Sequence, residues 1–180
     1  MKARARSLAL WINGIGGSAV LASYAYGIAS NPLTRGEIWG GVPDALRPFY
    51  TVSMLCAAAG YFAFSWFVLV RLDPGQTRVA ARFGFGLLNA LYALILFPSA
   101  LWMPLTFEML ESPSAPLWWA IRVTLALVGA GSLGLLVALV TVDPQRARRA
   151  RRVAVVGCAA FCVQTALLDA LVWPAYFPTP

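Results

Sequence analysis

The chain has 180 residues, of which 60% are hydrophobic and only 12% are charged, and its net charge is +7 at pH 7. A soluble domain is usually about 45–50% apolar and about 25% charged, so this composition excludes an ordinary water-soluble globule and indicates a membrane protein. The positive charge does not indicate nucleic-acid binding, because no basic face is interleaved with aromatic residues.

The apolar residues are gathered in five long stretches. A helix needs about 20 mostly apolar residues to cross the hydrocarbon core of a bilayer. Five stretches meet this requirement, at about 7–29, 48–70, 82–106, 117–142 and 152–173. Because a spanning helix satisfies its own backbone hydrogen bonds, we predict an all-α polytopic membrane protein. It is a single domain over residues 1–180, a bundle of five transmembrane helices.

Two of these spans carry small residues at a spacing of four. They are Gly14, Ser18 and Ala22 in the first span, and Ala126, Ala130 and Gly134 in the fourth. Such a stripe lets two helix backbones approach closely. Packing within the bundle is the simpler interpretation of both stripes, and homodimerisation is the alternative.

The charges between the spans alternate from one side to the other. Basic residues dominate three segments, which are the start MKARAR, the connection at 71–81 and the segment DPQRARRAR at 143–151. The connection at 107–116 contains Glu108 and Glu111 and no basic residue. Because lysine and arginine mark the cytoplasmic side of a membrane protein, we predict a cytoplasmic N-terminus and a C-terminus outside.

The third span contains polar residues and prolines in its interior. Asn89 and Tyr92 lie about one turn apart in LLNALYALILF. An asparagine inside a membrane often hydrogen-bonds to a neighbouring helix, so helix packing is the simpler role for both residues. Pro98 and Pro104 each remove a backbone donor, and we therefore expect the helix to bend between them.

Two ionisable residues lie well inside the spans, Arg122 in the fourth and Asp169 in the fifth. An arginine at the bilayer centre costs about 2.5–3.5 kcal/mol on insertion scales and usually faces a partner. The topology brings both residues to a similar depth near the outer side, so we predict a charge-assisted Arg122–Asp169 contact. The alternative is that Arg122 extends its long side chain to the outer headgroups, which leaves Asp169 in wetter surroundings.

Aromatic and polar residues gather on the same outer side. They include Tyr24, Tyr26, Tyr50, Thr51, Ser53, Ser99, Trp102, Gln164 and Thr165. Bent helices, aromatic side chains and a few polar groups are typical of a ligand pocket, so we predict an outward-facing pocket within the membrane. Tyr50 and Trp102 would provide stacking faces, and Arg122 would pair with a ligand carboxylate in competition with Asp169. Anchoring at the membrane interface is the simpler role of most of the tryptophans, which lie near the ends of the spans.

Neither catalysis nor metal binding is indicated. Histidine is absent from the sequence, which removes the commonest general base and metal ligand. Cys158 and Cys162 lie four residues apart, but two thiols alone make a poor metal site, and a buried cysteine ordinarily behaves as a small hydrophobic residue. Asp169, Glu108 and the cysteines are too scattered to assemble a catalytic site. We therefore expect a protein that is not an enzyme and has no metal site.

Three stretches of the chain share features with a known family. They are GIGGSAVLASYAYGIASNP in the first span, RPFYTVSMLCAAAGYFAF in the second and RFGFGLLNALYALILF in the third. They resemble the TspO/MBR family of tryptophan-rich sensory proteins. The family's usual tryptophan after the asparagine is Tyr92 here, the loop NPLTRGEIWGGVP does not match the family's proline-rich loop, and the last two spans show little likeness. The resemblance implies an intramembrane pocket for porphyrins or sterol-like ligands, involving the loop around Trp39 and the second helix around Tyr50.

These patterns favour two functions. We expect a membrane-embedded protein that binds an apolar or amphipathic small molecule, porphyrin-like or sterol-like, captured from the outer leaflet. The residues expected at the site are Trp39, Tyr50, Trp102, Arg122 and Asp169. The alternative is a non-catalytic accessory or structural subunit of a larger membrane complex, which the small-residue stripes and short loops favour. The expected partners are the lipid bilayer, a hydrophobic small molecule, and a second copy or other subunits of a complex.

Overall fold

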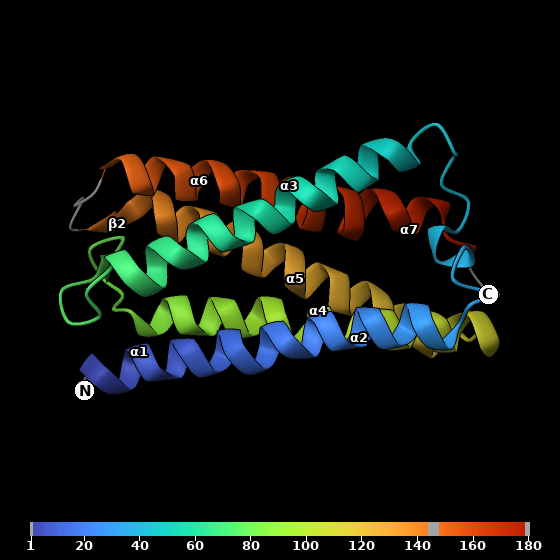
Figure 1. Cartoon of the computed structure of the whole chain (residues 1–180), viewed down its shortest axis with the longest axis horizontal. Helices are drawn as coiled ribbons and strands as arrows, with labels where there is room; N and C mark the ends of the chain where they lie inside the picture. The colour runs from blue at the N-terminus through green and yellow to red at the C-terminus, as the bar shows by residue number, and fades with distance from the viewer. Residues whose placement is uncertain (1, 144–147, 179–180) are drawn as a thin grey trace.

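The structure is a computed structural model, and it describes residues 2–143 and 148–178. Within these residues, five helices are long and apolar enough to cross a membrane, which confirms the predicted all-α five-helix bundle. They cover Ala3–Ser30, Arg47–Arg71, Gly86–Glu111, Ala115–Thr141 and Arg148–Tyr176. The two ends of the chain lie at opposite ends of the bundle (Figure 1).

Each span consists of one or more helical segments. The first contains α1 (Lys2–Trp11), η1 (Ile12–Gly16) and α2 (Gly17–Ser30), and the second contains α3 (Arg47–Trp66) and η3 (Phe67–Arg71). The third and fourth are the single helices α4 (Gly86–Glu111) and α5 (Ala115–Thr141). The fifth contains α6 (Arg148–Cys162), η4 (Val163–Val172) and α7 (Trp173–Tyr176). The segments η1, η3 and η4 are π-helical, whereas η2 (Glu37–Trp39) is a 3₁₀ turn between α2 and α3.

The third span begins at Gly86, slightly later than predicted, because residues 80–82 form a turn and Phe83 pairs back with Val79, next to a short sheet. The strand β1 (Arg78–Val79) pairs antiparallel with β2 (Val142–Asp143). After β1 the backbone turns through Ala80 and Ala81, whose φ angles are 48° and 57°. Alanine rarely adopts this left-handed conformation, so the sequence contained no signal for the turn.

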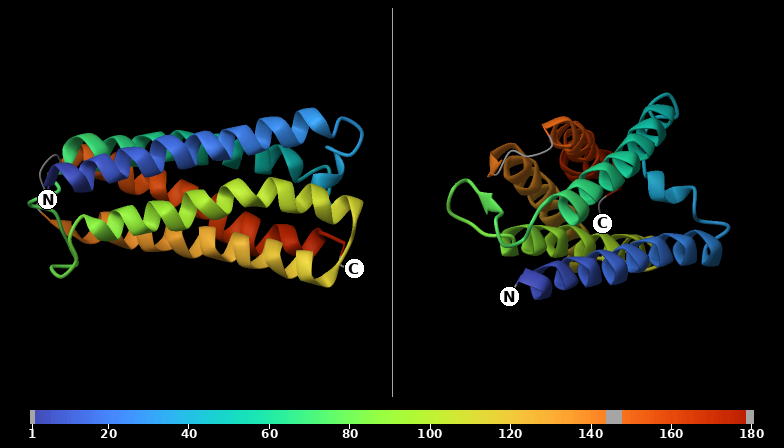
Figure 2. Two further views of the ribbon diagram at one scale, coloured as in Figure 1. Left: turned by 90° about the horizontal axis from the view of Figure 1, so that it is seen from below. Right: turned by 60° about the vertical axis from the view of Figure 1, so that its left-hand side comes forward.

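The five spans form a ring that is open along part of one side. α2 packs on α4, α4 on α5, α5 on α6 and η4, and α6 on α3. The first and second spans meet at one half of the molecule, where Arg6 Nη2 donates to the Leu72 carbonyl (2.6 Å) and the Tyr61 hydroxyl donates to Asn13 Oδ1 (2.6 Å). Toward the other end, α2 and α3 diverge (Figures 1 and 2). The seam between these two helices is therefore closed at one half only.

Two glycines form the crossing of α3 and α6. A Cβ atom added at Gly60 would collide with the carbonyl oxygen of Gly157. A Cβ atom added at Gly157 would lie 2.9 Å from the Cα atom of Gly60. The two backbones thus touch directly, which is the kind of close approach that small residues permit in membrane helices.

The small-residue stripe predicted on the first span does not pack within the bundle. Gly14, Ser18 and Ala22 are exposed, and nothing lies within 4 Å of a Cβ atom built at Gly14. The buried Gly16 and Gly27 face α4 instead, where added Cβ atoms would approach its side chains to 2.9 and 2.7 Å. The packing interpretation was wrong because the stripe lies on the side that faces away from α4. The stripe of the fourth span is also exposed, except for its glycine, which packs against α4.

The polar residues inside the third span hold neighbouring helices, which confirms the role predicted for them. The Asn89 side-chain amide donates to the Ala5 carbonyl on α1 (3.0 Å). The Tyr92 hydroxyl and the Ser65 Oγ atom on α3 are 3.1 Å apart. Asn89 and Tyr92 are themselves buried.

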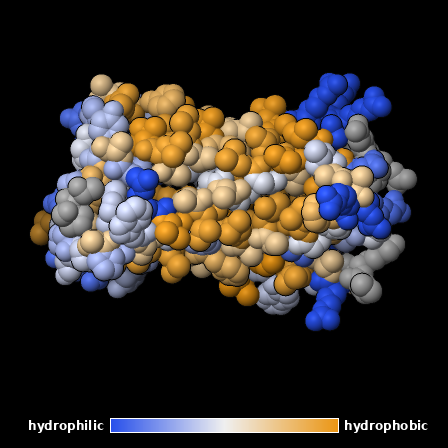
Figure 3. Space-filling view, turned by 180° about the vertical axis from the view of Figure 1, so that it is seen from behind, coloured by the Kyte–Doolittle hydropathy of each residue, from blue (hydrophilic) through white to orange (hydrophobic). Residues whose placement is uncertain are grey.

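The surface is divided into an apolar belt and two polar ends, as expected for a protein that spans a membrane (Figure 3). The arginine-rich end, which contains the N-terminus, carries Arg4, Arg6, Arg71, Arg78, Arg82, Arg148, Arg149, Arg151 and Arg152. The aromatic end, which contains the C-terminus, carries Tyr24, Trp39, Tyr50, Trp102, Trp118, Trp173 and Phe177.

Candidate functional site

The five predicted site residues come from five different elements and lie in the half of the molecule that ends at the aromatic end. Trp39 lies on η2, Tyr50 on α3, Trp102 on α4, Arg122 on α5 and Asp169 on η4. Only 3% of Tyr50 is exposed, and it belongs to a buried apolar cluster against which Trp39 and Trp102 pack. The fold therefore brings Trp39, Tyr50 and Trp102 together in one cluster, a convergence that the sequence left open.

Aromatic rings form a connected series across this end. The Trp102 ring lies 5.6 Å from the Tyr24 ring on α2 and 5.8 Å from the Trp173 ring on α7. Trp173 contacts Phe177 at 4.6 Å between ring centres, and Phe177 stacks on Trp118 at 5.7 Å. Rings in such offset or tilted contacts stabilise one another beyond the burial of their area. The series links α2, α4, α5 and α7.

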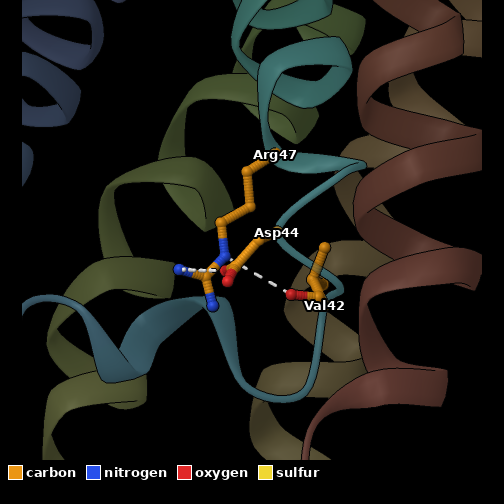
Figure 4. Close-up of polar contacts among 3 residues, drawn as sticks. All are labelled: Val42, Asp44 and Arg47. Carbon is orange, nitrogen blue, oxygen red and sulfur yellow. Dashed lines mark hydrogen bonds and ion pairs between the residues drawn. The ribbon is translucent and has the colours of Figure 1, made fainter.

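Polar contacts of Arg47 fix the connection between α2 and α3 (Figure 4). The Arg47 guanidinium forms an ion pair with Asp44 at 2.9 Å, and its Nε atom donates to the Val42 carbonyl at 3.3 Å. The same guanidinium lies 5.9 Å from the Trp39 ring, in a cation–π contact. Trp39 in turn meets the Tyr50 ring edge-on at 6.0 Å. Arg47 therefore holds Trp39 against the start of α3.

A π-helix positions the acidic residue of the site. The Gln164 side-chain amide donates to Asp169 Oδ1 at 2.7 Å. These residues are five positions apart, and the i→i+5 pattern of η4 places them on one face. The Tyr50 hydroxyl donates to the Leu168 carbonyl next to Asp169, at 3.4 Å. π-Helical turns are rare and frequently occur at functional sites, and this one spans 10 residues.

The predicted Arg122–Asp169 ion pair is not formed. Within residues 2–143 and 148–178 the ion pair present is Arg47–Asp44. The Arg122 guanidinium lies 5.9 Å from the Trp118 ring instead. The reason is the direction in which helical side chains lean, which is toward the N-terminus of their own helix. α5 and η4 run in opposite directions, so the Arg122 side chain leans toward the aromatic end and the Asp169 side chain toward the middle of the bundle.

Two buried polar atoms at the site have no hydrogen-bond partner. They are Trp102 Nε1 and Gln164 Oε1, and the third such atom in the described part of the chain is Asn89 Oδ1 on the other half. Only 6% of Gln164 is exposed. Buried polar atoms are normally hydrogen-bonded, and one left without a partner costs about 1–3 kcal/mol. The site thus offers one donor and one acceptor to a further molecule.

Gln164 was expected only among the polar residues of the outer side, and Trp118 and Trp173 were not expected at the site. Trp173 is buried, and its indole N–H donates to the Ile38 carbonyl at 2.9 Å, which ties α7 to the connection before α3. Tryptophans near span ends were interpreted as interface anchors, because that is their usual role in membrane proteins. The spacing of Gln164 and Asp169 carried no signal, because residues five apart do not share a face in an α-helix.

No protein-family model, curated protein or solved structure matches this chain. The resemblance to the TspO/MBR family therefore stays a prediction from three sequence stretches.

Proposed function

We propose that the protein binds an apolar or amphipathic small molecule, porphyrin-like or sterol-like, at the aromatic end. The observation that carries the proposal is the pair of unsatisfied buried atoms, Trp102 Nε1 and Gln164 Oε1, beside a series of aromatic rings. Ligand sites in proteins are mostly apolar and contain a few placed polar groups. A ligand that accepts from Trp102 and donates to Gln164 would recover hydrogen bonds that the free protein lacks.

The divergence of α2 and α3 supports entry from the membrane. The seam between these helices is held by side-chain hydrogen bonds at the arginine-rich end and near its middle, and it widens toward the aromatic end (Figure 2). Tyr24 and Tyr50 come from the two helices that flank the widening. A ligand dissolved in the bilayer would enter between these helices and separate rings that now pack on one another.

Each site residue has a proposed role. Tyr50 and Trp102 stack on the ligand, and Trp39 covers it from the connection that Arg47 fixes. Arg122 has no ion-pair partner within the described residues, so its guanidinium is left to pair with a carboxylate of an amphipathic ligand. Asp169, bonded to Gln164, gives the inner boundary of the site a polar surface. We further propose that this end faces the outside, and that binding involves neither catalysis nor a metal.

Titration with protoporphyrin in mild detergent, followed through tryptophan fluorescence, tests this function. We expect saturable quenching by the wild type and about fivefold weaker binding by Trp102→Phe, because phenylalanine keeps a ring but lacks the N–H donor. Trp119→Phe is the matched control, since Trp119 lies near the same end and is 65% exposed. Absence of saturable quenching in the wild type, or equal weakening by the control, would contradict the proposal.

A second candidate function is that of a non-catalytic accessory subunit in a larger membrane complex. The exposed stripe of Gly14, Ser18 and Ala22 favours it, because small residues on an outward face suit close contact with a helix of another chain. A homodimer through the same stripe is the simplest form of this assembly.

A further inference from the structure

A second feature of the molecule lies at the arginine-rich end, independently of the aromatic site. A surface cavity of about 530 Å³, wide open to its surroundings, lies there between the start of α1 and the end of η3. It is lined by Ala3, Arg6, Val70, Arg71, Leu72, Asp73 and Pro74. Arg71 is the last residue of a membrane span, so the cavity lies where the hydrocarbon core gives way to the lipid headgroups.

The two arginines of the cavity are held in place while keeping donors available. Arg6 is half-buried, and its Nη2 atom donates to the Leu72 carbonyl at 2.6 Å. A guanidinium has five N–H donors, so most of the Arg6 donors remain for another acceptor. The Arg71 guanidinium lies 4.6 Å from the Trp66 ring in a cation–π contact. In the described part of the chain neither arginine forms an ion pair.

The lining also contains one carboxylate, that of Asp73. Its Oδ1 atom accepts a hydrogen bond from the backbone N–H of Gly75 at 2.8 Å, within the turn that follows η3. The lining thus contains one carboxylate and two guanidinium groups. Arg4, Arg78 and Arg82 add positive charge at the same end and outnumber Asp143, and none of the three arginines forms an ion pair among the described residues. The summed potential at the cavity is therefore positive.

We infer that this cavity binds the phosphate-containing headgroup of an anionic phospholipid. Arg6 and Arg71 donate to the phosphate oxygens, as guanidinium groups do in charge-assisted phosphate contacts. The acyl chains begin over the apolar Ala3 and Val70 and continue into the bilayer. Basic pockets at the ends of membrane helices are suited to anionic headgroups. The cavity also has room for a glycerophosphate group, since a water molecule takes only about 30 Å³.

Thermal unfolding of the protein in neutral detergent tests the inference. We expect short-chain phosphatidylglycerol to raise Tm in a saturable way, and equal concentrations of phosphatidylcholine or inorganic phosphate to raise it much less. Arg6→Gln and Arg71→Gln should each shift the half-saturating lipid concentration upward by about tenfold or more, as loss of a charge-assisted hydrogen bond predicts. Arg4→Gln is the matched control, because it removes the same charge from exposed α1 surface outside the lining.

Three results would overturn the inference. Equal weakening by Arg4→Gln would mean that the lipid responds to the diffuse charge of this end and not to the cavity. Equal protection by phosphatidylcholine would mean that the headgroup charge is not recognised. Equal protection by inorganic phosphate would mean that the ligand is a free anion and not a lipid.

Asp73→Asn tests the same cavity, because it should strengthen lipid binding. This test remains valid even if the arginine variants do not fold. Asparagine keeps the oxygen that accepts from Gly75 and removes the negative charge from the lining. We expect phosphatidylglycerol to bind about twofold to fivefold more tightly, as expected for removing a nearby like charge. Unchanged or weaker binding in this variant would also overturn the inference.

Discussion

The two ends of the molecule are held together by different interactions. At the arginine-rich end, side chains from one span bond to the backbone of another, as Arg6 does to Leu72 and Asn89 to Ala5. At the aromatic end side chains also bond to backbone, as Tyr50 does to Leu168 and Trp173 to Ile38, but no such hydrogen bond joins α2 to α3 among the described residues. The helices there meet through rings, and two buried polar atoms, Trp102 Nε1 and Gln164 Oε1, have no partner. A short hydrogen bond fixes one geometry, whereas ring packing can be rearranged at lower cost. The difference explains why the first and second spans close at one end and diverge at the other, and why we place the ligand at the aromatic end.

The largest effect of a substitution on stability is expected midway between the two ends, at the α3–α6 crossing. Gly60→Ala should lower the free energy of unfolding by about 3 kcal/mol, because the added methyl group meets the Gly157 backbone, which cannot move aside as a side chain would. Denaturation of the two variants in detergent measures this change in the free energy of unfolding. Gly14→Ala is the control and should be neutral or slightly stabilising, since that position is open and alanine favours helix. Equal stability of the two variants would mean that α3 and α6 do not cross there.

An intermediate effect is expected at the closed part of the seam. Tyr61→Phe removes the hydroxyl that donates to Asn13 Oδ1 and should lower the free energy of unfolding by about 1 kcal/mol, because a half-buried acceptor loses its partner. Tyr26→Phe provides the comparison, since Tyr26 is 74% exposed and should tolerate the change. If both variants behave alike, the hydrogen bond does not close the seam.

The smallest effect is expected at the acidic residue of the aromatic site. Asp169→Asn should change the free energy of unfolding by less than about 1 kcal/mol, because asparagine still accepts from Gln164 and no ion pair is lost. The double variant with Arg122→Gln should show additive effects, as residues without direct contact do. A large loss in Asp169→Asn that is restored by exchanging the two residues would show that they pair after all.

The sequence predicted the helices better than it predicted the contacts between them. Hydropathy and length were sufficient for the five spans, because the bilayer imposes both on any helix that crosses it. Asn89 and Tyr92 could also be assigned to helix packing, since a polar group inside a span needs a partner. The depth of a residue within the membrane could be counted from the ends of its span. For this reason Arg122 and Asp169 were correctly placed in the same half of the bundle.

The sequence did not predict which face of each helix points into the bundle. Gly14, Ser18 and Ala22 form a regular stripe, but the glycines that pack on α4 are Gly16 and Gly27. Nothing in the sequence marks the π-helical segments either, and η4 decides that Asp169 meets Gln164. Rotation about the helix axis depends on all the neighbours at once, so a pattern within one span does not determine it.

The glycine crossing of α3 and α6 has a mechanical consequence. At its closest point neither helix presents a side chain that could interlock with the other, so we expect α3 to turn about Gly60 more easily than about any interdigitated contact. Gly60 lies near the middle of the span Arg47–Arg71. If α3 and η3 rotate together about Gly60, their two ends would move in opposite directions. Widening the gap at Tyr50 would displace Leu72 and the neighbouring Arg71 in the opposite sense. The aromatic site and the headgroup cavity would thus be coupled through one rigid rod, and spin-label distances across the two ends would vary together.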